Sequence, residues 1–502
     1  MIRFRPAIMF RFFCALSLAG LSSVVSNCTA PFQAPDLGGI YNRSARQHDL
    51  YRNPVIVIPG ILGSRLRDRD SGRTVWGTFA SDYISPRTAE GARLVALPMR
   101  EGASLGALQD SVFADQVLDR ISLRWLSLPL EQKAYYYLLR VLGAGGYRDQ
   151  TLGSLGAIDY GSDHFTCFQF PYDWRRDIVE NARSLHEFIL EKRKFVQEQF
   201  EKRYGLPNHP IKFDIVAHSM GGLLTRYYLR YGTDDLPSGA MQPKPTWKGS
   251  EHVERAILIG TPNAGSLRAL EYLVEGVRFT LLLPKFDAAI LGTMPAIYQL
   301  LPRARHRRVV ESGSGDPLDV FDPAVWTRMK WGLVSPEQAA VLEVLLPDVK
   351  NRETRHRIAL DHLGKNLARA RKLAEALDLP AAPPPHLTLQ LIAADSQTTT
   401  AVLEVNPING NLKVLARGPG DGTVLRDSAI FDERVGGPWS PRLVSPIQWD
   451  RVNFVFADHL GMTRDPVFMD NLLFQLLEAP RQNPKGESVK NQSSLSRQSP
   501  SP

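Results

Sequence analysis

Ser219 lies in the segment AHSMG at residues 217–221, which has the small-x-Ser-x-Gly spacing of a nucleophile elbow. An apolar run at residues 211–217 predicts a buried strand before the turn, and residues 221–231 predict a helix after it. Ala217 takes the place of the usual first glycine and still meets the steric demand of a sharp turn. Strand, turn and helix in this order expose the Ser219 hydroxyl, which could attack a carbonyl carbon. The alternative is a Ser-Gly turn without chemistry.

A serine hydroxyl is a weak nucleophile and needs a base, which in turn needs an acid to orient it. After a nucleophile elbow, both partners follow along the chain, with the acid first. Asp421 lies among glycines in GPGDGTV at residues 418–424, where a tight loop could direct its carboxylate toward a site. Asp395, which follows a predicted strand, is the rival. For both aspartates the alternative is a turn residue that hydrogen-bonds its own backbone.

His459 is the predicted base because it lies on a loop between an apolar run and a final helix. His356, His362 and His386 also follow the serine. His356 and His362 fall on a charged helix, where a solvated position is expected. His218, next to the serine, is expected to be structural, since its side chain should point away from the tip of the elbow.

Acyl transfer also requires N–H donors for the oxyanion that develops on the attacked carbonyl. The turn PGILGS at residues 59–64 follows the first predicted strand, and its glycines let backbone N–H groups face a ligand. We expect the amides of Ile61 and Met220 to form this oxyanion hole; the alternative is a plain turn. No P-loop, zincin or dinucleotide-binding fingerprint occurs, and a Ser/Asp/His set requires neither metal nor cofactor.

Strands that alternate with helices predict an α/β fold, with a mostly parallel sheet covered by helices on both faces. Besides the strand before the serine, strands are expected at residues 55–58, 165–170, 256–259, 387–393, 400–405, 412–416 and 452–456. Helices are expected at residues 181–204, 221–231 and 467–477.

Two insertions, at about residues 66–160 and 266–385, interrupt this alternation, and such segments commonly cap an active site. The first is expected to be irregular apart from a helix near residues 130–142. The second is expected to hold helices at residues 267–283, at 336–346 with Ser335 as N-cap, and from about 352 to 377. The expected organisation is a signal segment at 1–28, a linker at 29–52, one α/β domain with the two cap insertions at 53–478, and a disordered tail at 479–502.

The N-terminus has the pattern of a secretory signal, with three arginines before a short apolar run at residues 12–25. That run is too short to be a comfortable transmembrane helix. Cys28 follows in VSNC, similar to a bacterial lipoprotein box, although asparagine before the cysteine is unusual. Cleavage near Ala30 and an uncleaved anchor are the alternatives. We expect a protein of the bacterial cell envelope, periplasmic or lipid-anchored, or a secreted one, in which Cys167 is buried without a disulfide partner.

The 502 residues include 60 Lys and Arg against 52 Asp and Glu, a net charge of +8. Hydrophobic residues make up 43% of the chain, enough for a large core, which excludes wholesale disorder. The basic residues are spread out except for Arg303, Arg305, Arg307 and Arg308, so nucleic acid is not an expected partner. This arginine cluster would suit anionic lipid head groups or form a solvated face.

Six segments together resemble the lecithin:cholesterol acyltransferase family, within the α/β-hydrolases. They are PVIVIPGILGS at 54–64, FPYDWR at 170–175, AHSMG at 217–221, GTPNAGS at 260–266, GDGTV at 420–424, and His459. They occur in the order of the family over most of the chain. Eukaryotic members use disulfides around the lid, and this chain lacks those cysteines.

The resemblance implies that Ser219, Asp421 and His459 form a catalytic triad, which selects the aspartate of the glycine-rich loop over its rival. It also implies that the Ile61 and Met220 amides form the oxyanion hole.

Other positions are assigned by the same resemblance. Asp173, Trp174 and Arg175 are expected to be structural or to line an acyl pocket. Trp76 is expected in a region associated with the lid and the membrane.

The hypothesis is a serine acyl-transfer enzyme acting on lipid esters, either phospholipids or acylglycerols. Its acyl-serine intermediate would pass to an alcohol, as in an O-acyltransferase, or to water, as in a lipase or phospholipase. The expected partners are a lipid substrate and a membrane surface, with no obligate protein partner. The alternatives are a non-catalytic lipid-binding envelope protein with a hydrolase fold, and a serine hydrolase of non-lipid esters or amides.

Overall fold

The computed structural model describes residues 34–47, 52–79, 84–125, 128–133, 135–153, 165–237, 239, 241–278 and 285–479. The expected signal segment, Cys28 and nearly all of the expected tail lie outside these residues, so cleavage, lipidation and cellular location stay predictions, as do the domain boundaries. None of the helices in the described ranges is both long enough and apolar enough to cross a membrane.

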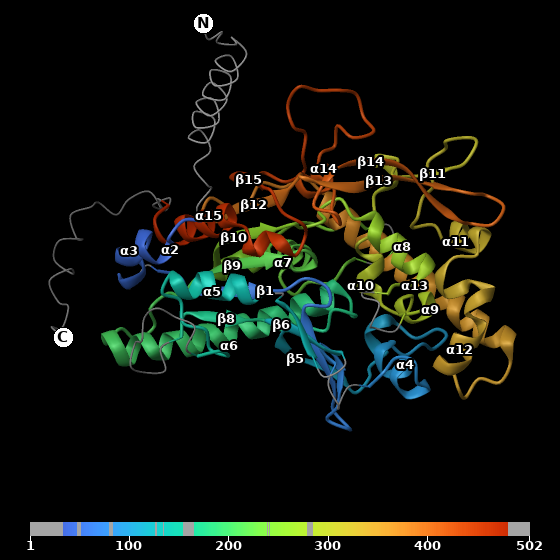
Figure 1. The fold of residues 1–502 in the computed structure, drawn as a ribbon, viewed down its shortest axis with the longest axis horizontal. Coiled ribbons are helices and arrows are strands. Elements are labelled where there is room, and N and C mark those ends of the chain that lie inside the picture. The colour runs from blue at the N-terminus through green and yellow to red at the C-terminus, as the bar shows by residue number, and fades with distance from the viewer. Residues whose placement is uncertain are drawn as a thin grey trace, which may run out of the picture.

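Six parallel strands form the central sheet, in the order β15-β12-β10-β9-β1-β8 (Figure 1). Their bounds are β1 Val55–Ile58, β8 Cys167–Gln169, β9 Phe213–His218, β10 Val253–Ile259, β12 Thr388–Ala394 and β15 Arg451–Val455. Each corresponds to a predicted strand. All four residues of β1 are buried, because a strand with parallel neighbours on both sides and covered faces reads as a continuous apolar run.

Helices cover both faces of this sheet. Successive residues of a strand point to opposite faces, so the side chains of β1 contact the helices on each face. Ile56 and Ile58 pack in one hydrophobic cluster with α6 (Ile178–Tyr204) and α7 (Met220–Tyr231). Val55 and Val57 pack in another with α5 (Tyr136–Ala144) and α15 (Pro466–Leu477). The predicted α/β fold class is therefore confirmed.

The first insertion is not irregular, so that prediction was wrong. It forms a three-stranded sheet in the order β3-β2-β5 and a second in the order β4-β6-β7. The bounds are β2 Ser64–Asp68, β3 Thr74–Trp76, β4 Thr78–Phe79, β5 Val112–Val117, β6 Arg120–Trp125 and β7 Leu128–Lys133. The helix expected near residues 130–142 begins only at Tyr136, because the residues before it pair with β6 instead. A local apolar pattern does not reveal a strand partner.

The second insertion holds the expected helices with corrected bounds. The first of them, α8 (Leu267–Glu275), ends before residue 283 because Gly276 adopts a φ of 73°. A Cβ at Gly276 would lie 2.5 Å from the Phe286 carbonyl oxygen. Ser335 caps the next helical segment through its side chain, as predicted, with a 3₁₀ turn at Pro336–Gln338 leading into α12 (Ala339–Leu345). The long helix α13 (Arg352–Asp378) follows.

A third three-stranded sheet, in the order β11-β13-β14, joins one strand of the second insertion to two strands that follow that insertion in the sequence. Its bounds are β11 Val309–Glu311, β13 Gln397–Val405 and β14 Leu412–Gly420, so the two strands predicted at 400–405 and 412–416 form one hairpin. The remaining α-helices of the described residues are α2 Leu37–Ile40, α3 Asn42–Arg46, α4 Ala89–Val95, α9 Ala288–Leu291, α10 Pro295–Tyr298, α11 Pro323–Met329 and α14 Arg426–Ile430.

Candidate active site

The turn between β9 and α7 holds Ser219 in a strained backbone conformation, with φ 53° and ψ −123°. Space around it is tight. A Cβ at Gly221 would lie 2.4 Å from the Pro59 carbonyl oxygen, and one at Gly222 would lie 1.9 Å from Thr261 Oγ1. The Ser219 amide donates a 2.8 Å hydrogen bond to the carbonyl of Ile259 at the end of β10. Two glycines and one strand end therefore fix this serine at the carboxyl edge of the sheet.

Asp421 and His459 meet this serine from two later segments of the chain. His459 Nε2 lies 2.9 Å from Ser219 Oγ, and His459 Nδ1 lies 2.7 Å from Asp421 Oδ2. The His459 amide also donates to the Asp421 carbonyl at 2.9 Å, which joins the two loops. The three residues thus have the connectivity of a nucleophile, a base and an orienting acid.

Asp421 is buried and held by its own loop. Its Oδ1 accepts hydrogen bonds from the amides of Thr423 at 2.9 Å and Val424 at 2.6 Å. Burial raises the pKa of this carboxyl, but the charge of His459 and the hydrogen bonds from His459, Val424 and Thr423 lower the pKa below its ordinary value. The carboxylate therefore stays ionised, which suits a group that orients an imidazole.

The rival candidates lie elsewhere. Asp395 forms an ion pair with Arg426 at 3.3 Å on a partly exposed surface. His356 is exposed, as predicted, and His386 is exposed with its Nε2 at 3.1 Å from the Ser250 carbonyl. The solvated position predicted for His362 was wrong, because this side chain is buried and lies 3.0 Å from the Thr293 carbonyl. The many charged residues of α13 led to the wrong prediction, because one face of this helix is buried.

The turn after β1 approaches the serine closely. A Cβ at Gly60 would lie 2.8 Å from Ser219 Cβ, so only glycine allows this contact. Ile61 follows directly on this turn. Met220 is the first residue of α7, where an N–H has no intrahelical acceptor. The assignment of the Ile61 and Met220 amides to an oxyanion hole stays a prediction that this placement supports.

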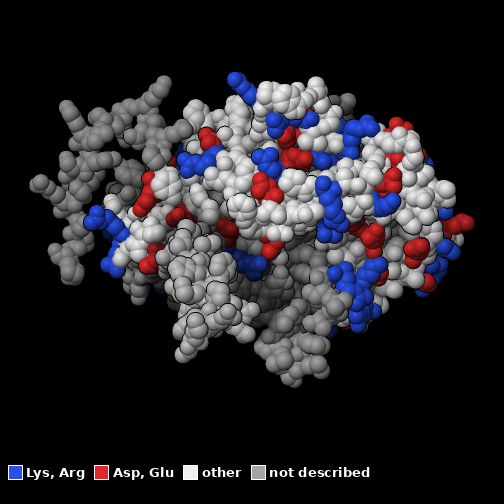
Figure 2. Space-filling model, turned by 45° about the horizontal axis from the view of Figure 1, so that its top comes forward, with Lys and Arg blue, Asp and Glu red and all other residues white. Residues whose placement is uncertain are grey.

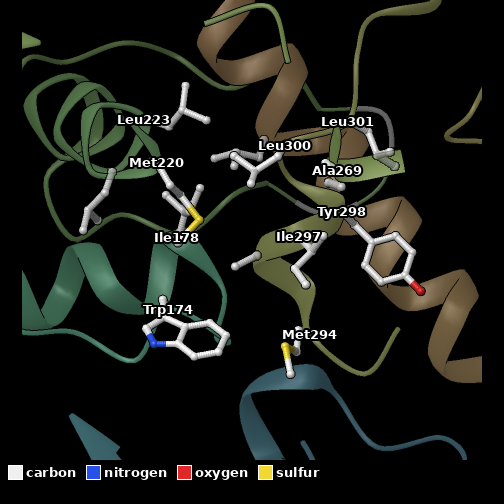
Figure 3. Close-up of a cluster of buried hydrophobic side chains, with 14 of the residues drawn as sticks. Trp174, Ile178, Met220, Leu223, Ala269, Met294, Ile297, Tyr298, Leu300 and Leu301 are labelled. Carbon is white, nitrogen blue, oxygen red and sulfur yellow. The ribbon is translucent and has the colours of Figure 1, made fainter. Parts of the chain in front are cut away.

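Apolar side chains back the site. Met220 belongs to a buried cluster with Leu223, Ile178 and Trp174 (Figure 3). The Trp174 ring meets that of Trp76 edge to face, with centroids 5.7 Å apart. Both tryptophans are buried among the described residues, so Trp76 is part of the core around the site.

Arg175, beside that tryptophan, is fully buried. It pairs with Asp173 at 2.7 Å and with Asp110 at 2.8 Å. Its pKa is raised, since these two carboxylates outweigh the effect of burial. This buried ion pair supports a structural role for Asp173 and Arg175, which is one of the two roles expected for them.

Three of the four arginines in the cluster pair with acidic neighbours, and Arg307 donates to the Gly315 carbonyl. Arg303 pairs with Asp378 at 3.0 Å, and Arg308 pairs with Asp427. Arg305 pairs with both Asp378 and Glu433. On the face shown in Figure 2, basic and acidic side chains are interspersed rather than gathered by sign. This cluster therefore offers no unbroken positive surface for lipid head groups.

Tyr135 also lies at the site, and no sequence motif predicts it. Its hydroxyl accepts a hydrogen bond from the Gly60 amide at 2.7 Å and lies 2.9 Å from His218 Nδ1. His218 Nε2 lies 3.0 Å from the His459 carbonyl, which agrees with the structural role expected of His218. Among the described residues, no group of three or more His, Cys, Asp and Glu side chains could hold a metal ion.

A parallel sheet covered on both faces, with a serine on the turn after a central strand and an aspartate and a histidine on later loops, defines an α/β-hydrolase. The family model of lecithin:cholesterol acyltransferase matches residues 145–340, so the resemblance to that family is confirmed over this segment. The segment contains Ser219, whereas Asp421 and His459 lie beyond it. No curated protein sequence matches the chain.

Several solved structures are similar to this chain. The Tle4–Tli4 complex matches with a TM-score of 0.48 and 17% identity, covering 85% of this chain and 98% of that one. EstA from Clostridium botulinum matches with a TM-score of 0.34 and 13% identity, covering 91% and 94%. Lipase 1 from Pelosinus fermentans matches with a TM-score of 0.30 and 11% identity, covering 86% and 99%. At these values none of them bears on what this chain binds or does.

Proposed function

We propose that this protein is a lipid-ester hydrolase or acyltransferase that works through an acyl-serine intermediate on Ser219. The observation that carries the proposal is the continuous hydrogen-bonded set of Ser219, His459 and Asp421, with heavy-atom separations of 2.9 and 2.7 Å. The rival acid, Asp395, is instead paired with Arg426.

The chemistry follows from the positions of these atoms. Ser219 Oγ gives its proton to His459 Nε2 and attacks the ester carbonyl carbon, while Asp421 holds the imidazolium that forms. The amides of Ile61 and Met220 donate to the oxyanion, and one such donor is worth about 3 to 4 kcal/mol of barrier. Collapse of the intermediate breaks the ester bond, and the leaving alcohol takes the proton from His459. Water or an acceptor alcohol then attacks the acyl-serine by the same steps in reverse.

A lipid substrate is supported by the family match and by the surface next to the base. Phe456 and Leu460 flank His459 on one loop and are 84% and 38% exposed. Large apolar side chains beside a catalytic histidine would contact acyl chains or a lipid surface at low desolvation cost.

The test compares wild type with Ser219→Ala on phospholipid vesicles and on emulsified acylglycerol. Products are measured by mass spectrometry with and without a long-chain alcohol or a sterol, and both proteins are shown to be folded by circular dichroism. Fatty acid that depends on Ser219 indicates a lipase or phospholipase. An ester formed on the added alcohol indicates an acyltransferase. Equal product from both proteins would contradict the proposal.

Two other outcomes would redirect the assignment. Wild-type protein that binds vesicles but does not react with a fluorophosphonate at Ser219 would be a lipid-binding protein with a hydrolase fold. Turnover of peptide or polyester substrates alone would identify a hydrolase of non-lipid bonds.

A further inference from the structure

Two buried side chains outside the triad connect its parts. Tyr135 lies just before α5, and His218 is the last residue of β9. Both are almost completely buried, and their rings meet edge to face with centroids 5.7 Å apart. Neither belongs to the Ser219, His459 and Asp421 set, so the proposed chemistry gives them no part.

The direction of every hydrogen bond in this connection is fixed by its ends. The His459 carbonyl can only accept, so His218 Nε2 carries a proton and donates to it at 3.0 Å. Burial lowers the pKa of His218 to about 3, so its ring is neutral and Nδ1 is an acceptor. The Tyr135 hydroxyl therefore donates to His218 Nδ1, while its oxygen accepts from the Gly60 amide.

These hydrogen bonds connect the turn that holds the proposed oxyanion hole to the loop that holds the proposed base. Gly60 lies against Ser219 and directly precedes Ile61, whose amide is assigned to the oxyanion hole. His459 is the assigned base, and its backbone carbonyl is the other end of the chain of hydrogen bonds. One neutral, directional chain thus spans from the oxyanion turn to the base loop, through elements far apart in the sequence.

We propose that Tyr135 and His218 are positioning residues that hold the oxyanion turn and the His459 loop at fixed separations from Ser219. The inference rests on the proposed function. A neutral ring is essential to this role, because the His218 and His459 rings have centroids 4.8 Å apart and a charge on His218 would oppose the imidazolium that His459 becomes.

The first test is Tyr135→Phe, which removes one hydroxyl and keeps the ring. We expect kcat for a short-chain nitrophenyl ester to fall about 10- to 100-fold because the oxyanion turn loses its anchor, with KM nearly unchanged. The matched control is Tyr231→Phe, which removes another buried hydroxyl, one that donates to the Ala376 carbonyl at 2.7 Å at the far end of α7. The control should lose stability but keep the wild-type kcat.

The second test compares His218→Gln with His218→Leu. A glutamine amide can replace the Nε2–H donor to the His459 carbonyl, whereas leucine fills the space without a donor. We expect glutamine to retain a kcat about 10-fold or more above that of leucine. A role in core packing alone would make leucine equal or better, because the site is buried. If Tyr135→Phe does not fold, this pair still decides the question.

The outcomes separate the two proposals. Wild type without Ser219-dependent turnover of any ester would overturn the proposed function, and this inference with it. An active wild type together with wild-type kcat in Tyr135→Phe, or with leucine equal to glutamine at position 218, would overturn the inference alone.

Discussion

At the scale of single residues, replacing the buried carboxylate of Asp421 tests whether this residue acts in catalysis or only stabilises its own loop. An asparagine at this position keeps the acceptor for the amides of Thr423 and Val424 but presents a neutral group to His459 Nδ1. The imidazole is then free to adopt the wrong tautomer, and the imidazolium loses its counter-charge. We expect Asp421→Asn to lower kcat for ester hydrolysis about 10³-fold or more, measured by steady-state kinetics.

The control for this variant is Asp395→Asn, which removes the rival carboxylate. Asp395 contacts Arg426 on a partly exposed surface, and such ion pairs contribute little to stability. Its kcat should stay within a few-fold of wild type. A larger loss for Asp395→Asn than for Asp421→Asn would reverse the assignment of the acid.

Local signatures predict Ser219 and His459 as members of the proposed triad. The local sequence leaves Asp421 and Asp395 as alternatives, and only the family resemblance selects Asp421. The serine lies on a small-x-Ser-x-Gly turn, the aspartate in a glycine-rich loop and the histidine between a strand and the last helix. Tyr135 has no such signature, since its hydroxyl meets Gly60 and His218 only after α5 docks on the sheet. Contacts created by docking leave no pattern in the local sequence.

At the scale of elements, α13 contains a histidine that should make the protein sensitive to acid. His362 is buried and its Nε2 donates to the Thr293 carbonyl, in the turn before α10. Burial lowers the pKa of His362 from 6.5 to about 4. Between pH 6.5 and about 4, His362 therefore binds a proton in the unfolded chain but stays neutral in the native state. The free energy of unfolding falls as the pH decreases from 6.5 to about 4, by at most about 1.4 kcal/mol per pH unit from this group.

The measurement is the urea midpoint at several pH values for wild type and His362→Gln, which keeps a donor for Thr293 but does not titrate. We expect the variant to lose less stability than wild type between pH 6.5 and 4.5. His356→Gln is the matched control, since His356 is exposed on the same helix, and its pH dependence should equal that of wild type. Parallel curves for all three proteins would refute the assignment.

The sequence predicts strands of the central sheet correctly where all residues of a strand are buried. The prediction is wrong where a segment pairs with a strand that the local pattern does not reveal. Continuous apolar runs such as VIVI in β1 could only be buried strands or short buried helices, and the Pro-Gly after them favoured a strand. Leu128–Lys133, with the sequence LPLEQK, pairs with β6 as β7, so the helix predicted there begins later. The end of α8 at Gly276 depends on a close approach to Phe286, which no periodicity encodes.

At the scale of the whole molecule, the first insertion is fastened to the sheet through a buried cation. Arg175, in the loop after β8, donates to the Leu94 carbonyl at 2.9 Å, at the end of α4, and pairs with Asp110 before β5. Asp173 completes the site at 2.7 Å. Removing the guanidinium would leave the largely buried carboxylates of Asp173 and Asp110 with Arg176 as their remaining ion-pair partner, at 3.4 and 2.6 Å. Losing the fully buried cation of this network is costlier than losing one partner of an exposed pair.

We therefore expect Arg175→Met to lower the free energy of unfolding by about 3 to 5 kcal/mol, measured by urea denaturation, and to speed limited proteolysis within residues 84–125. Arg357→Gln is the matched control, because the Arg357–Glu101 pair at 3.0 Å also joins the first insertion to a distant element, α13, but is exposed. That variant should change stability by no more than about 1 kcal/mol. If both variants lose the same stability, the buried cation does not fasten the insertion. If Arg175→Met unfolds at the same urea concentration as wild type but is cut faster, the insertion detaches locally while the sheet and the Ser219 site stay folded.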